Sequence, residues 1–408
     1  MTTPITALER QLIDHAADLR DEMTAFCARL LQTPSVNGVH DERALALVIA
    51  EQAKALGLEA QVVGANPNRP NVVISTSSEG PTGLLLIGHL DTVPAGDEAA
   101  WSHPPFAGEQ ADGKLYGRGA VDTKGGMTAA LYALWLLKQH PEALPNGRVQ
   151  LICVPDEESG ATGTLGIKWL HDNGLLEGKG AIYAYSDDLI TLGHRGVLRY
   201  KLVCRGQAVH SGSNEWQNGT AGKNAITGMA RLLLELEGQP FEYSTTPYFT
   251  EFRPIITAGT LIQGGVSVNI VPDTCEAFID IRITPEFDRL RMEGVIDGCI
   301  ARVAAERGVT FERELLINAS AALTPDDSPI VRVLESVVRD VKGKEPKRVV
   351  AGPANEGYLL IERSIPTICG FGPMGENAHA IDEYVVIDSL PQTAAIFALT
   401  AARLSAVS

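Results

Sequence analysis

The segment around which the rest of the chain is organised opens with Gly88-His89-Leu90-Asp91-Thr92-Val93-Pro94 and closes with Gly117-Arg118-Gly119-Ala120-Val121-Asp122-Thr123-Lys124-Gly125-Gly126. The apolar run Leu84-Leu85-Leu86-Ile87 before it predicts a buried strand that ends in His-x-Asp. Residues two apart on a strand share one face, so the side chains of His89 and Asp91 could contact the same bound group. An imidazole beside a carboxylate suits a divalent metal.

Asp122 is the second polar group of this segment. We expect it at the end of a second short strand, after which Gly125 and Gly126 lead into a helical pattern. The residues alone indicate that His89 and Asp122 bind metal, while Asp91 orients the His89 ring from the side opposite the metal. A His-x-Asp triplet is common by chance, so the other motifs of the chain must support this interpretation.

Length and composition indicate a globular protein of two domains. The chain has 408 residues, too many for one ordinary core, and 45% of them are hydrophobic. Its net charge of −16 argues against a nucleic-acid or anionic-membrane partner, because both would repel it. Six dispersed cysteines without a C-x-x-C pair, a charged N-terminus and the lack of a long apolar run favour a cytoplasmic location.

Strands alternate with helices over the first half of the chain, which predicts an α/β fold with a mostly parallel sheet. Three polar groups directly follow expected strands: His89, Asp156-Glu157-Glu158 and Ser186-Asp187-Asp188. Open α/β sheets bind ligands past the carboxyl ends of their strands, so these groups are candidates for one site. Strands are expected at 59–63, 71–75, 84–89, 149–154 and 181–185, and helices within 5–31 and at 42–56, 127–137 and 164–173.

The pattern changes after Gly196. Strands and helices then follow in the order β-α-β-β-α-β, which predicts an inserted α+β domain of the ferredoxin-like kind. Its expected elements are a strand at 197–204, a helix at 221–237, a strand at 275–283, a helix at 288–307 and a strand at 309–315. From about Ala319 we expect helices at 330–341, 356–362 and 390–404 and a strand at 367–371. The predicted domains are 1–195 with 316–408, and 196–315.

Three further groups carry candidate chemistry. The acidic run Asp156-Glu157-Glu158 is equally well explained as a solvated turn, but one glutamate could bind metal while its neighbour acts as general base on metal-bound water. His379 lies in the Gly-rich segment 372–383 and is a candidate ligand, against the alternative of an exposed loop histidine. His210 stands in a loop of the inserted domain.

Together these motifs resemble the M20 metallopeptidase family, which includes acetylornithine deacetylase, succinyl-diaminopimelate desuccinylase, aminoacylase and glutamate carboxypeptidase. The likeness extends from about residue 20 to about residue 400. It implies a zinc-exopeptidase-like catalytic domain with an inserted lid and dimerisation domain. The motifs are His89-Leu90-Asp91, Gly117 to Gly126, Asp156-Glu157-Glu158, Asn269 to Asp273 with Asp280-Ile281-Arg282, and Ala378-His379.

The resemblance implies that His89 ligates one zinc ion. Asp91 would be the carboxylate partner of His89 and would fix its tautomer. Asp122 would bridge both metals, and the peptide between Asp122 and Thr123 would be cis.

The resemblance also assigns the second zinc ion and the base. Glu158 and His379 would bind this metal, and Glu157 would be the general base. The remaining ligand of the family is a carboxylate at the end of the next strand, which here is Asp187, with Asp188 as its close competitor. We therefore expect two Zn²⁺ ions, with Co²⁺ or Mn²⁺ as substitutes.

The inserted domain carries the expected substrate contacts. His210 would reach across from a partner subunit to polarise the scissile carbonyl or stabilise the oxyanion. Asn269 and Arg282 would contact the substrate, with Arg282 pairing with its carboxylate through a guanidinium fork, although a solvated or salt-bridged Arg282 fits the strand pattern as well.

The expected function is hydrolysis of an amide bond next to a free carboxylate, in an N-acyl amino acid or a short peptide, by metal-hydroxide attack. Within the family a dipeptidase or aminopeptidase is the alternative, and an aspartate at the strand-end ligand position resembles that branch. The inserted-domain motifs look more like the deacylase branch, and the segment 352–357 departs from its usual sequence. The alternative from another class is an inert relative that only binds a ligand.

Overall fold

The computed structural model describes residues 5–145, 147–185, 187 and 189–406, which fall into two compact units. The larger unit comprises Met1–Gly193, Leu323–Val350 and Asn355–Ser408, and the smaller unit comprises His194–Ala322 and Ala351–Ala354. The sequence placed the end of the inserted segment at 315. The smaller unit continues to Ala322 because its last strand, β12 (Thr310–Ala319), stays paired with β9 (Gly196–Arg205) up to Ala319.

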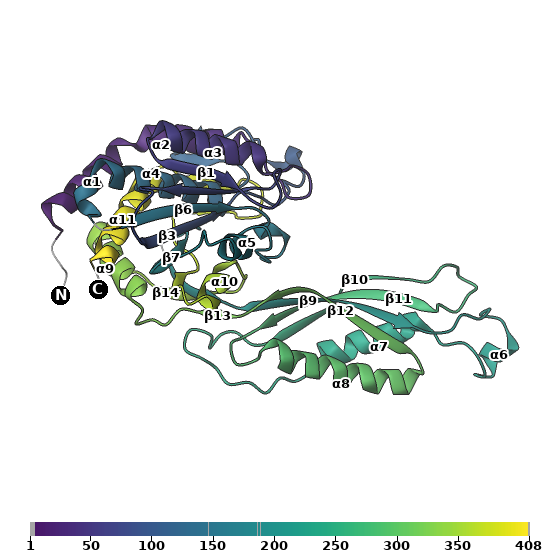
Figure 1. Ribbon diagram of the computed structural model, residues 1–408. Helices are drawn as coiled ribbons and strands as arrows, with labels where there is room; N and C mark the ends of the chain where they lie inside the picture. Colours follow the sequence, from purple (N-terminus) through teal and green to yellow (C-terminus); the bar gives the residue numbers. More distant parts are fainter. Residues whose placement is uncertain (1–4, 146, 186, 188, 407–408) are drawn as a thin grey trace. The chain divides into compact units, whose positions relative to one another are not determined.

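A six-stranded sheet forms the centre of the larger unit (Figure 1). Its strand β3 pairs in parallel with β6 and β7, and β7 pairs in parallel with β15, whereas β2 is antiparallel to both β1 and β6. The mostly parallel sheet predicted from the strand–helix alternation is therefore confirmed. In sheet order the strands are β1 (Glu59–Val63), β2 (Asn71–Ser75), β6 (Arg148–Val154), β3 (Thr82–His89), β7 (Gly180–Tyr183) and β15 (Thr367–Ile368).

The middle of this sheet is apolar because it is covered by helices. All eight residues of β3 are buried, as expected of a parallel strand with both faces covered. Helices α4 (Gly125–Gln139) and α11 (Ser389–Ser405) pack against β3, and most of their residues are buried. The remaining helices of the unit are α1 (Ala7–Asp18), α2 (Arg20–Leu31), α3 (Arg43–Ala55), α5 (Ile167–Asp172), α9 (Pro329–Lys342) and α10 (Gly357–Glu362).

A second, four-stranded sheet of the larger unit brings two distant segments together. Strand β17 (Tyr384–Val386) pairs with β5 (Lys114–Tyr116), so the chain before Asp122 lies beside the chain after His379. Its outer strands are β4 (Glu109–Ala111) and β16 (Gly375–Glu376). A separate three-stranded sheet has the order β13 (Ala322–Leu323), β8 (Ile190–His194) and β14 (Arg348–Ala351).

The expectation that Asp122 ends a short strand is wrong. Strand β5 ends at Tyr116, and Asp122 lies in the turn Ala120–Lys124 that leads directly into α4, where its own backbone angles, φ −124° and ψ 83°, are not helical. The turn begins after Gly119, which has a φ of 87° that only glycine adopts at little cost. The peptide between Asp122 and Thr123 is cis, as the resemblance implied.

The smaller unit is a four-stranded antiparallel sheet with two helices on one face (Figure 1). The order β10-β11-β9-β12 and the succession of elements agree with the predicted ferredoxin-like arrangement. Alternate residues of β11 (Thr274–Ile283), from Cys275 to Ile283, are buried against α7 (Ala225–Glu237) and α8 (Arg289–Arg307). Strand β10 (Ile255–Gly264) was not located from the sequence, because its mostly exposed residues give no apolar alternation. Residues Asn214–Gln217 form the short helix α6.

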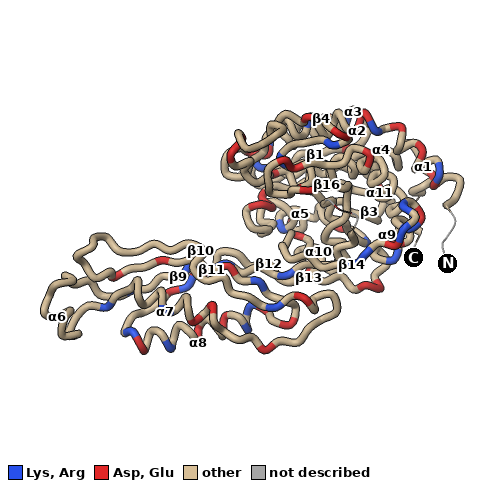
Figure 2. The backbone as a smooth tube through the Cα atoms, turned by 180° about the vertical axis from the view of Figure 1, so that it is seen from behind, with Lys and Arg blue, Asp and Glu red and all other residues tan. Residues whose placement is uncertain are grey.

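Charged residues of both signs lie close together on the smaller unit. Figure 2 shows Lys and Arg interspersed among Asp and Glu along α8 and the neighbouring strands. Arg302 pairs with Glu235 at 2.7 Å, and Arg313 pairs with Asp297 at 2.7 Å. Exposed pairs of this kind contribute little stability, so the apolar core must hold the unit together.

All six cysteines are buried as free thiols. Within the described ranges, no helix is both long enough and apolar enough to cross a membrane.

Arg403 links three helices of the larger unit. Its Nε donates to Glu9 of α1 at 2.7 Å, and its Nη1 donates to Asp340 of α9 at 2.6 Å. Burial alone would raise the Glu9 pKa, but hydrogen bonds from Arg403 and Thr6 outweigh it and hold the pKa below its ordinary 4.5. A carboxylate with a lowered pKa stabilises the fold above its unfolded-state pKa and loses this effect as the pH falls through the folded-state value.

We therefore expect Glu9→Gln to lower the free energy of unfolding by about 1 kcal/mol near neutral pH, because a hydrogen bond between charged partners is lost. The difference from wild type should shrink as the pH falls below 4.5 through the lowered folded-state pKa, because Glu9 then becomes protonated in the folded chain as well. Urea titrations at neutral pH and across this acidic range measure the change. Glutamine still accepts from the Thr6 amide, and a loss that does not change with pH would contradict the ionic role of Glu9.

Candidate metal and catalytic site

The carboxyl ends of neighbouring parallel strands bring the central site residues together. His89 is the last residue of β3 and lies in register with Val154, the last residue of β6. Glu157 and Glu158 follow β6 in a short 3-10 turn, and Tyr185 follows β7. This is the edge at which open α/β sheets bind ligands, as the sequence predicted.

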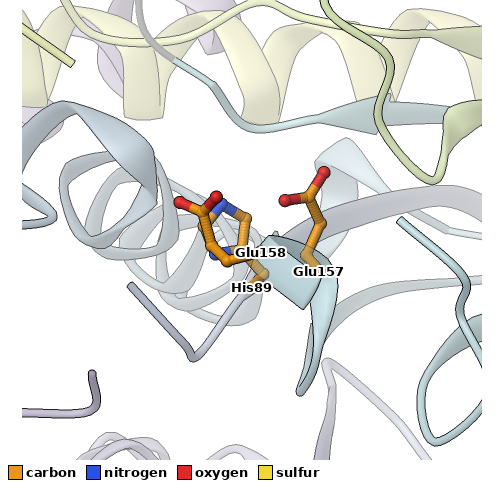
Figure 3. A group of neighbouring side chains, drawn as sticks. All are labelled: His89, Glu157 and Glu158. Carbon is orange, nitrogen blue, oxygen red and sulfur yellow. The ribbon is translucent and has the colours of Figure 1, made fainter. Parts of the chain in front are cut away.

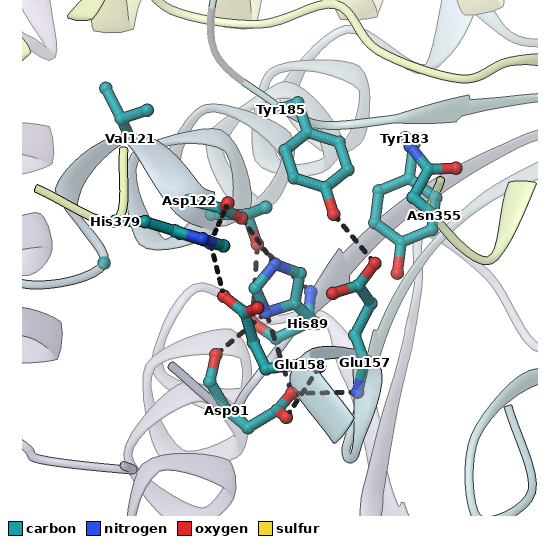
Figure 4. Close-up of polar contacts among 12 residues, drawn as sticks. His89, Asp91, Val121, Asp122, Glu157, Glu158, Tyr183, Tyr185, Asn355 and His379 are labelled. Atoms are coloured by element: carbon teal, nitrogen blue, oxygen red, sulfur yellow. Dashed lines mark hydrogen bonds and ion pairs between the residues drawn. The ribbon is translucent and has the colours of Figure 1, made fainter. Parts of the chain in front are cut away.

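His89 is held from both sides. Its Nδ1 lies 2.8 Å from the main-chain carbonyl oxygen of Asp91, and its Nε2 lies 2.6 Å from Oδ1 of Asp122 (Figure 4). Because a carbonyl oxygen only accepts, Nδ1 carries the proton and Nε2 is directed at Asp122. Burial would lower the His89 pKa, but the charge of Asp122 outweighs it and raises the pKa well above its ordinary value.

Asp91 was expected to fix the His89 tautomer through its carboxylate. In the structure, the main-chain carbonyl of Asp91 contacts His89 Nδ1 instead, and the nearest oxygen of the Asp91 carboxylate lies 3.7 Å from Nδ1. The carboxylate instead accepts from the amides of Glu157 at 3.1 Å and Glu158 at 3.0 Å, and from Asn37 Nδ2 at 3.1 Å. Burial raises the Asp91 pKa to about 7. Asp91 therefore positions the turn that carries both glutamates.

Glu383 plays the same part for the turn that carries Asp122. One of its oxygens accepts from the Gly119 amide at 2.9 Å and from Arg118 at 2.5 Å, and the other accepts from the amides of Val121 at 2.9 Å and Asp122 at 3.2 Å. Glu383 is fully buried. Sequence reasoning missed its role, although Glu383 closes the same Gly-rich segment that was singled out for its histidine.

Glu158 and His379 meet Asp122 on one side of the site. His379 Nε2 lies 3.0 Å from Glu158 Oε1 and 3.3 Å from Asp122 Oδ2 (Figure 4). Hydrogen bonds to Asp122 and then to Glu158 raise the His379 pKa to about 10. Ligand atoms of these three side chains lie within 4.8 Å of one another, so the three could share one cation.

Glu157 belongs to a second group, with His89 and Glu158, whose ligand atoms also lie within 4.8 Å of one another. Figure 3 shows the Glu158 carboxylate beside the His89 ring, whereas the Glu157 carboxylate points to a separate position. The hydroxyl of Tyr185 donates to Glu157 Oε1 at 3.1 Å. Burial raises the Glu157 pKa to about 8, although the charge of His89 acts in the opposite direction.

Asp187, the expected strand-end ligand, lies in neither of these two groups of described residues. It is exposed, and its backbone pairs with Pro373 and Gly372. The competitor Asp188 lies outside the described residues. Among the described residues past the end of β7, Tyr185 reaches the group through its hydroxyl, and the sequence gave no metal-site signal for it.

The three remaining candidates belong to the smaller unit. His210 and Asn269 lie close together there, because the Ser211 amide donates to the Asn269 carbonyl at 2.9 Å and His210 bridges to Ile270. His210 and Asn269 are both exposed.

Arg282 lies on the face of β11 opposite the buried core. It is salt-bridged to Asp280 at 2.8 Å, so the alternative prediction of a salt-bridged Arg282 also has a structural basis. Burial and then the charge of Arg282 lower the pKa of Arg195, a cationic neighbour that sequence reasoning did not single out.

The donor set of the larger unit suits divalent cations. Asp122, Glu158 and His379 supply two carboxylates and one imidazole, and both are ligand types that Zn²⁺ binds. Because Nδ1 of His89 carries the proton, its Nε2 is available as a further metal ligand. The residues present therefore fit the metals that the sequence implied.

The chain belongs to the peptidase family M20/M25/M40, whose model matches residues 85–403. It is a hydrolase of the class that acts on C–N amide or peptide bonds, which confirms the family and the enzyme class inferred from the motifs.

Relatives with known names cover nearly the whole chain. The succinyl-diaminopimelate desuccinylase of Paracoccus denitrificans is 28% identical over 378 residues, which cover 91% of this chain and 95% of the relative. The protein of the same name from Methylobacterium radiotolerans is 29% identical over 396 residues, which cover 94% of this chain and 96% of the relative.

Solved structures show the same fold at lower identity. An M20 family metallo-carboxypeptidase from Sulfolobus solfataricus has a TM-score of 0.75 at 19% identity, covering 95% of this chain and all (100%) of that one. A dinuclear metal binding peptidase of the M20 family from Bacillus subtilis has a TM-score of 0.66 at 17% identity, covering 97% and 98% of the two chains. At these identities the likeness establishes the fold.

Proposed function

We propose that the chain is a metal-dependent amidohydrolase that cleaves the amide bond of an N-acyl amino acid next to a free carboxylate. The observation that carries this proposal is the Asp122–Glu158–His379 group, with the buried Glu157 carboxylate beside it. A ligand set with an adjacent carboxylate that is not needed as a ligand suits hydrolysis, because that carboxylate is free to move a proton. Relatives that cover most of the chain are named succinyl-diaminopimelate desuccinylase, which supports a deacylase.

In this proposal the residues divide the work. Asp122, Glu158 and His379 hold one cation, His89 and Asp122 face a second, and Asp187 keeps its predicted role as a further ligand. Bound divalent cations polarise the amide carbonyl and make water acidic enough to ionise near neutral pH. Glu157 accepts a proton from the attacking water and returns it to the leaving nitrogen, while Asp91 keeps Glu157 and Glu158 oriented.

The smaller unit would supply the substrate contacts. We propose that His210 stabilises the oxyanion and that Asn269 and Arg282 bind the substrate. Arg282 holds Asp280 through its Nε and Nη2 atoms, so its Nη1 edge is the one suited to a substrate carboxylate. The nearby charge of Arg195 adds to the attraction for an anionic group.

A substrate panel tests the activity. The full-length chain, stripped of metal and then loaded with Zn²⁺ or Co²⁺, should hydrolyse N-succinyl and N-acetyl amino acids and lose this activity in excess chelator. Faster turnover of dipeptides would favour the peptidase alternative. Binding of a panel member without turnover by the metal-loaded protein would show that it is an inert relative.

We propose that the chain forms a homodimer through the smaller unit, in which His210 acts on the site of the other subunit. Strand β10 is an edge strand of the sheet and carries the exposed apolar residues Leu261 and Ile262. An unpaired apolar edge is a template for pairing with a second copy. Light scattering should give about twice the chain mass of 43.6 kDa, and Leu261→Lys should shift it towards the monomer. A fully active wild-type monomer would contradict this proposal.

A further inference from the structure

Two histidines of the larger unit meet outside the proposed catalytic group. Helix α1 packs against α4, and His15 of α1 lies beside His140, the residue that follows α4. His15 Nδ1 and His140 Nε2 are 3.2 Å apart, and the two ring planes are inclined at 79°. The proposed function uses neither residue.

The pair is remote from the proposed catalytic metals. Asp122 lies in the turn directly before α4, and the helix then runs for 15 residues, from Gly125 to Gln139, before the chain reaches His140. At a rise of about 1.5 Å per residue, the two ends of α4 are about 22 Å apart. An ion held by the histidines would therefore be a separate one.

The spacing of the two nitrogens suits one metal ion. Zn²⁺ binds imidazole nitrogen at about 2.0–2.1 Å, so two imidazole ligands of a tetrahedral ion have their nitrogens about 3.3–3.4 Å apart. Both rings are partly exposed, so they can turn to direct their lone pairs at one ion, and water can complete its coordination. Imidazole suits Zn²⁺, Ni²⁺ and Cu²⁺, whereas Mg²⁺ and Ca²⁺ prefer oxygen ligands.

Glu142 favours the tautomer of His140 that a metal requires. Its Oε1 lies 3.6 Å from His140 Nδ1, the ring nitrogen that does not face His15. A carboxylate there favours a proton on Nδ1 and leaves the Nε2 lone pair directed at His15. Metal-binding histidines usually have a carboxylate, a carbonyl or a water at their second nitrogen. Without metal, His15 Nδ1 donates to His140 Nε2; a metal ion would replace this hydrogen, and His15 would carry its proton on Nε2.

We infer that His15 and His140 form a separate site for one divalent transition-metal ion of the kind that imidazole binds, with Glu142 as the outer partner of His140. The ion links α1 to the end of α4. Because it binds the folded chain, it stabilises that state.

Trp135 of α4 gives a readout that is specific to this site. Its ring centroid lies 4.9 Å from that of His15, so Ni²⁺ bound to the histidines should quench its fluorescence. Trp135→Phe should remove this signal and leave the amount of bound Ni²⁺ unchanged. The titration uses the full-length, metal-stripped chain, with bound Ni²⁺ counted by equilibrium dialysis.

The catalytic group is the same in all variants, so the comparison between them isolates the histidine site. Wild type should bind one more Ni²⁺ per chain than His15→Gln and His140→Gln, and both variants should lose the quenching. Glu142→Gln should keep the site but weaken it by about 10–100-fold, as expected when an outer partner of a ligand is lost. Equal Ni²⁺ binding by wild type and both histidine variants would overturn the inference.

His171 provides the matched control. It is an exposed histidine of α5 with its own carboxylate neighbour, Asp172, at 3.2 Å, and His171→Gln should change neither the bound Ni²⁺ nor the quenching. Thermal unfolding checks that each variant folds. If the histidine variants do not fold, wild type and Trp135→Phe decide the question, because fluorescence of Trp135 that Ni²⁺ does not quench would also overturn the inference.

Discussion

Replacing Glu157 with glutamine is expected to lower kcat by about 10²–10⁴-fold on the best substrate of the panel, the range lost when a general base is removed. Glutamine has nearly the same shape, and its side-chain oxygen can still accept from the Tyr185 hydroxyl. It has no affinity for the proton of an attacking water, so the loss should fall on kcat rather than on KM.

The metal content of this variant separates the two roles that the geometry allows for Glu157. A base should be removable without loss of zinc, whereas a ligand beside His89 and Glu158 should not. Zinc analysis after dialysis should therefore give the wild-type stoichiometry. A parallel loss of zinc and activity would make Glu157 a ligand, and near wild-type kcat with full metal would refute its role as base.

Asp156 provides the matched control for Glu157. It is the preceding residue and also a buried carboxylate, and burial raises its pKa to about 6. It lies in neither ligand group, and asparagine tolerates its φ of 62°. Asp156→Asn should keep kcat within about 3-fold of wild type, a change of less than about 1 kcal/mol in the barrier.

The strand ends that carry the site could be predicted from local sequence. The apolar run before His89 and the run before Asp156 each end in polar residues, and parallel strands place those ends at one edge. The structure brings His89, Glu158 and His379 to this edge with Asp122. Their assignment as ligands remains a prediction.

Side-chain reach past a strand end could not be read from the sequence. Strand β7 ends at Tyr183, so the period of two did not indicate that the Tyr185 hydroxyl would reach Glu157. The ring of Tyr185 is oriented by stacking on Tyr183, a contact that no local motif announces, and the assignment of Asp187 as a ligand stays a prediction.

Two buried carboxylates organise the site without being its proposed ligands. Asp91 accepts the amides of the turn that holds Glu157 and Glu158, and Glu383 accepts the amides of the turn that holds Asp122. In each case several N–H donors take the place of the water that would solvate the carboxylate. These hydrogen bonds offset the cost of burying its charge. Such partners come from distant segments and have no local motif.

Replacing Glu383 with alanine is expected to lower the free energy of unfolding by about 3–5 kcal/mol, because Arg118 is left as an uncompensated buried charge. Arg118 is 2% exposed and cannot turn to water without rearranging the segment that precedes Asp122. The amides of Gly119 and Val121 lose their acceptor in the same variant. Denaturant titration of the metal-free chain measures this loss.

The milder variant Glu383→Gln separates positioning from stability. Glutamine keeps one side-chain oxygen as an acceptor, so the loss of stability should be smaller. It no longer neutralises Arg118, and it cannot accept hydrogen bonds from the Asp122 turn through two oxygens. Zinc affinity should fall by about 10–100-fold, as expected when an outer partner of a ligand is lost. Glu376, an exposed glutamate of the same segment, is the control, and Glu376→Gln should change neither quantity. Unchanged zinc affinity in a folded Glu383→Gln chain would show that Glu383 supports the fold without positioning Asp122.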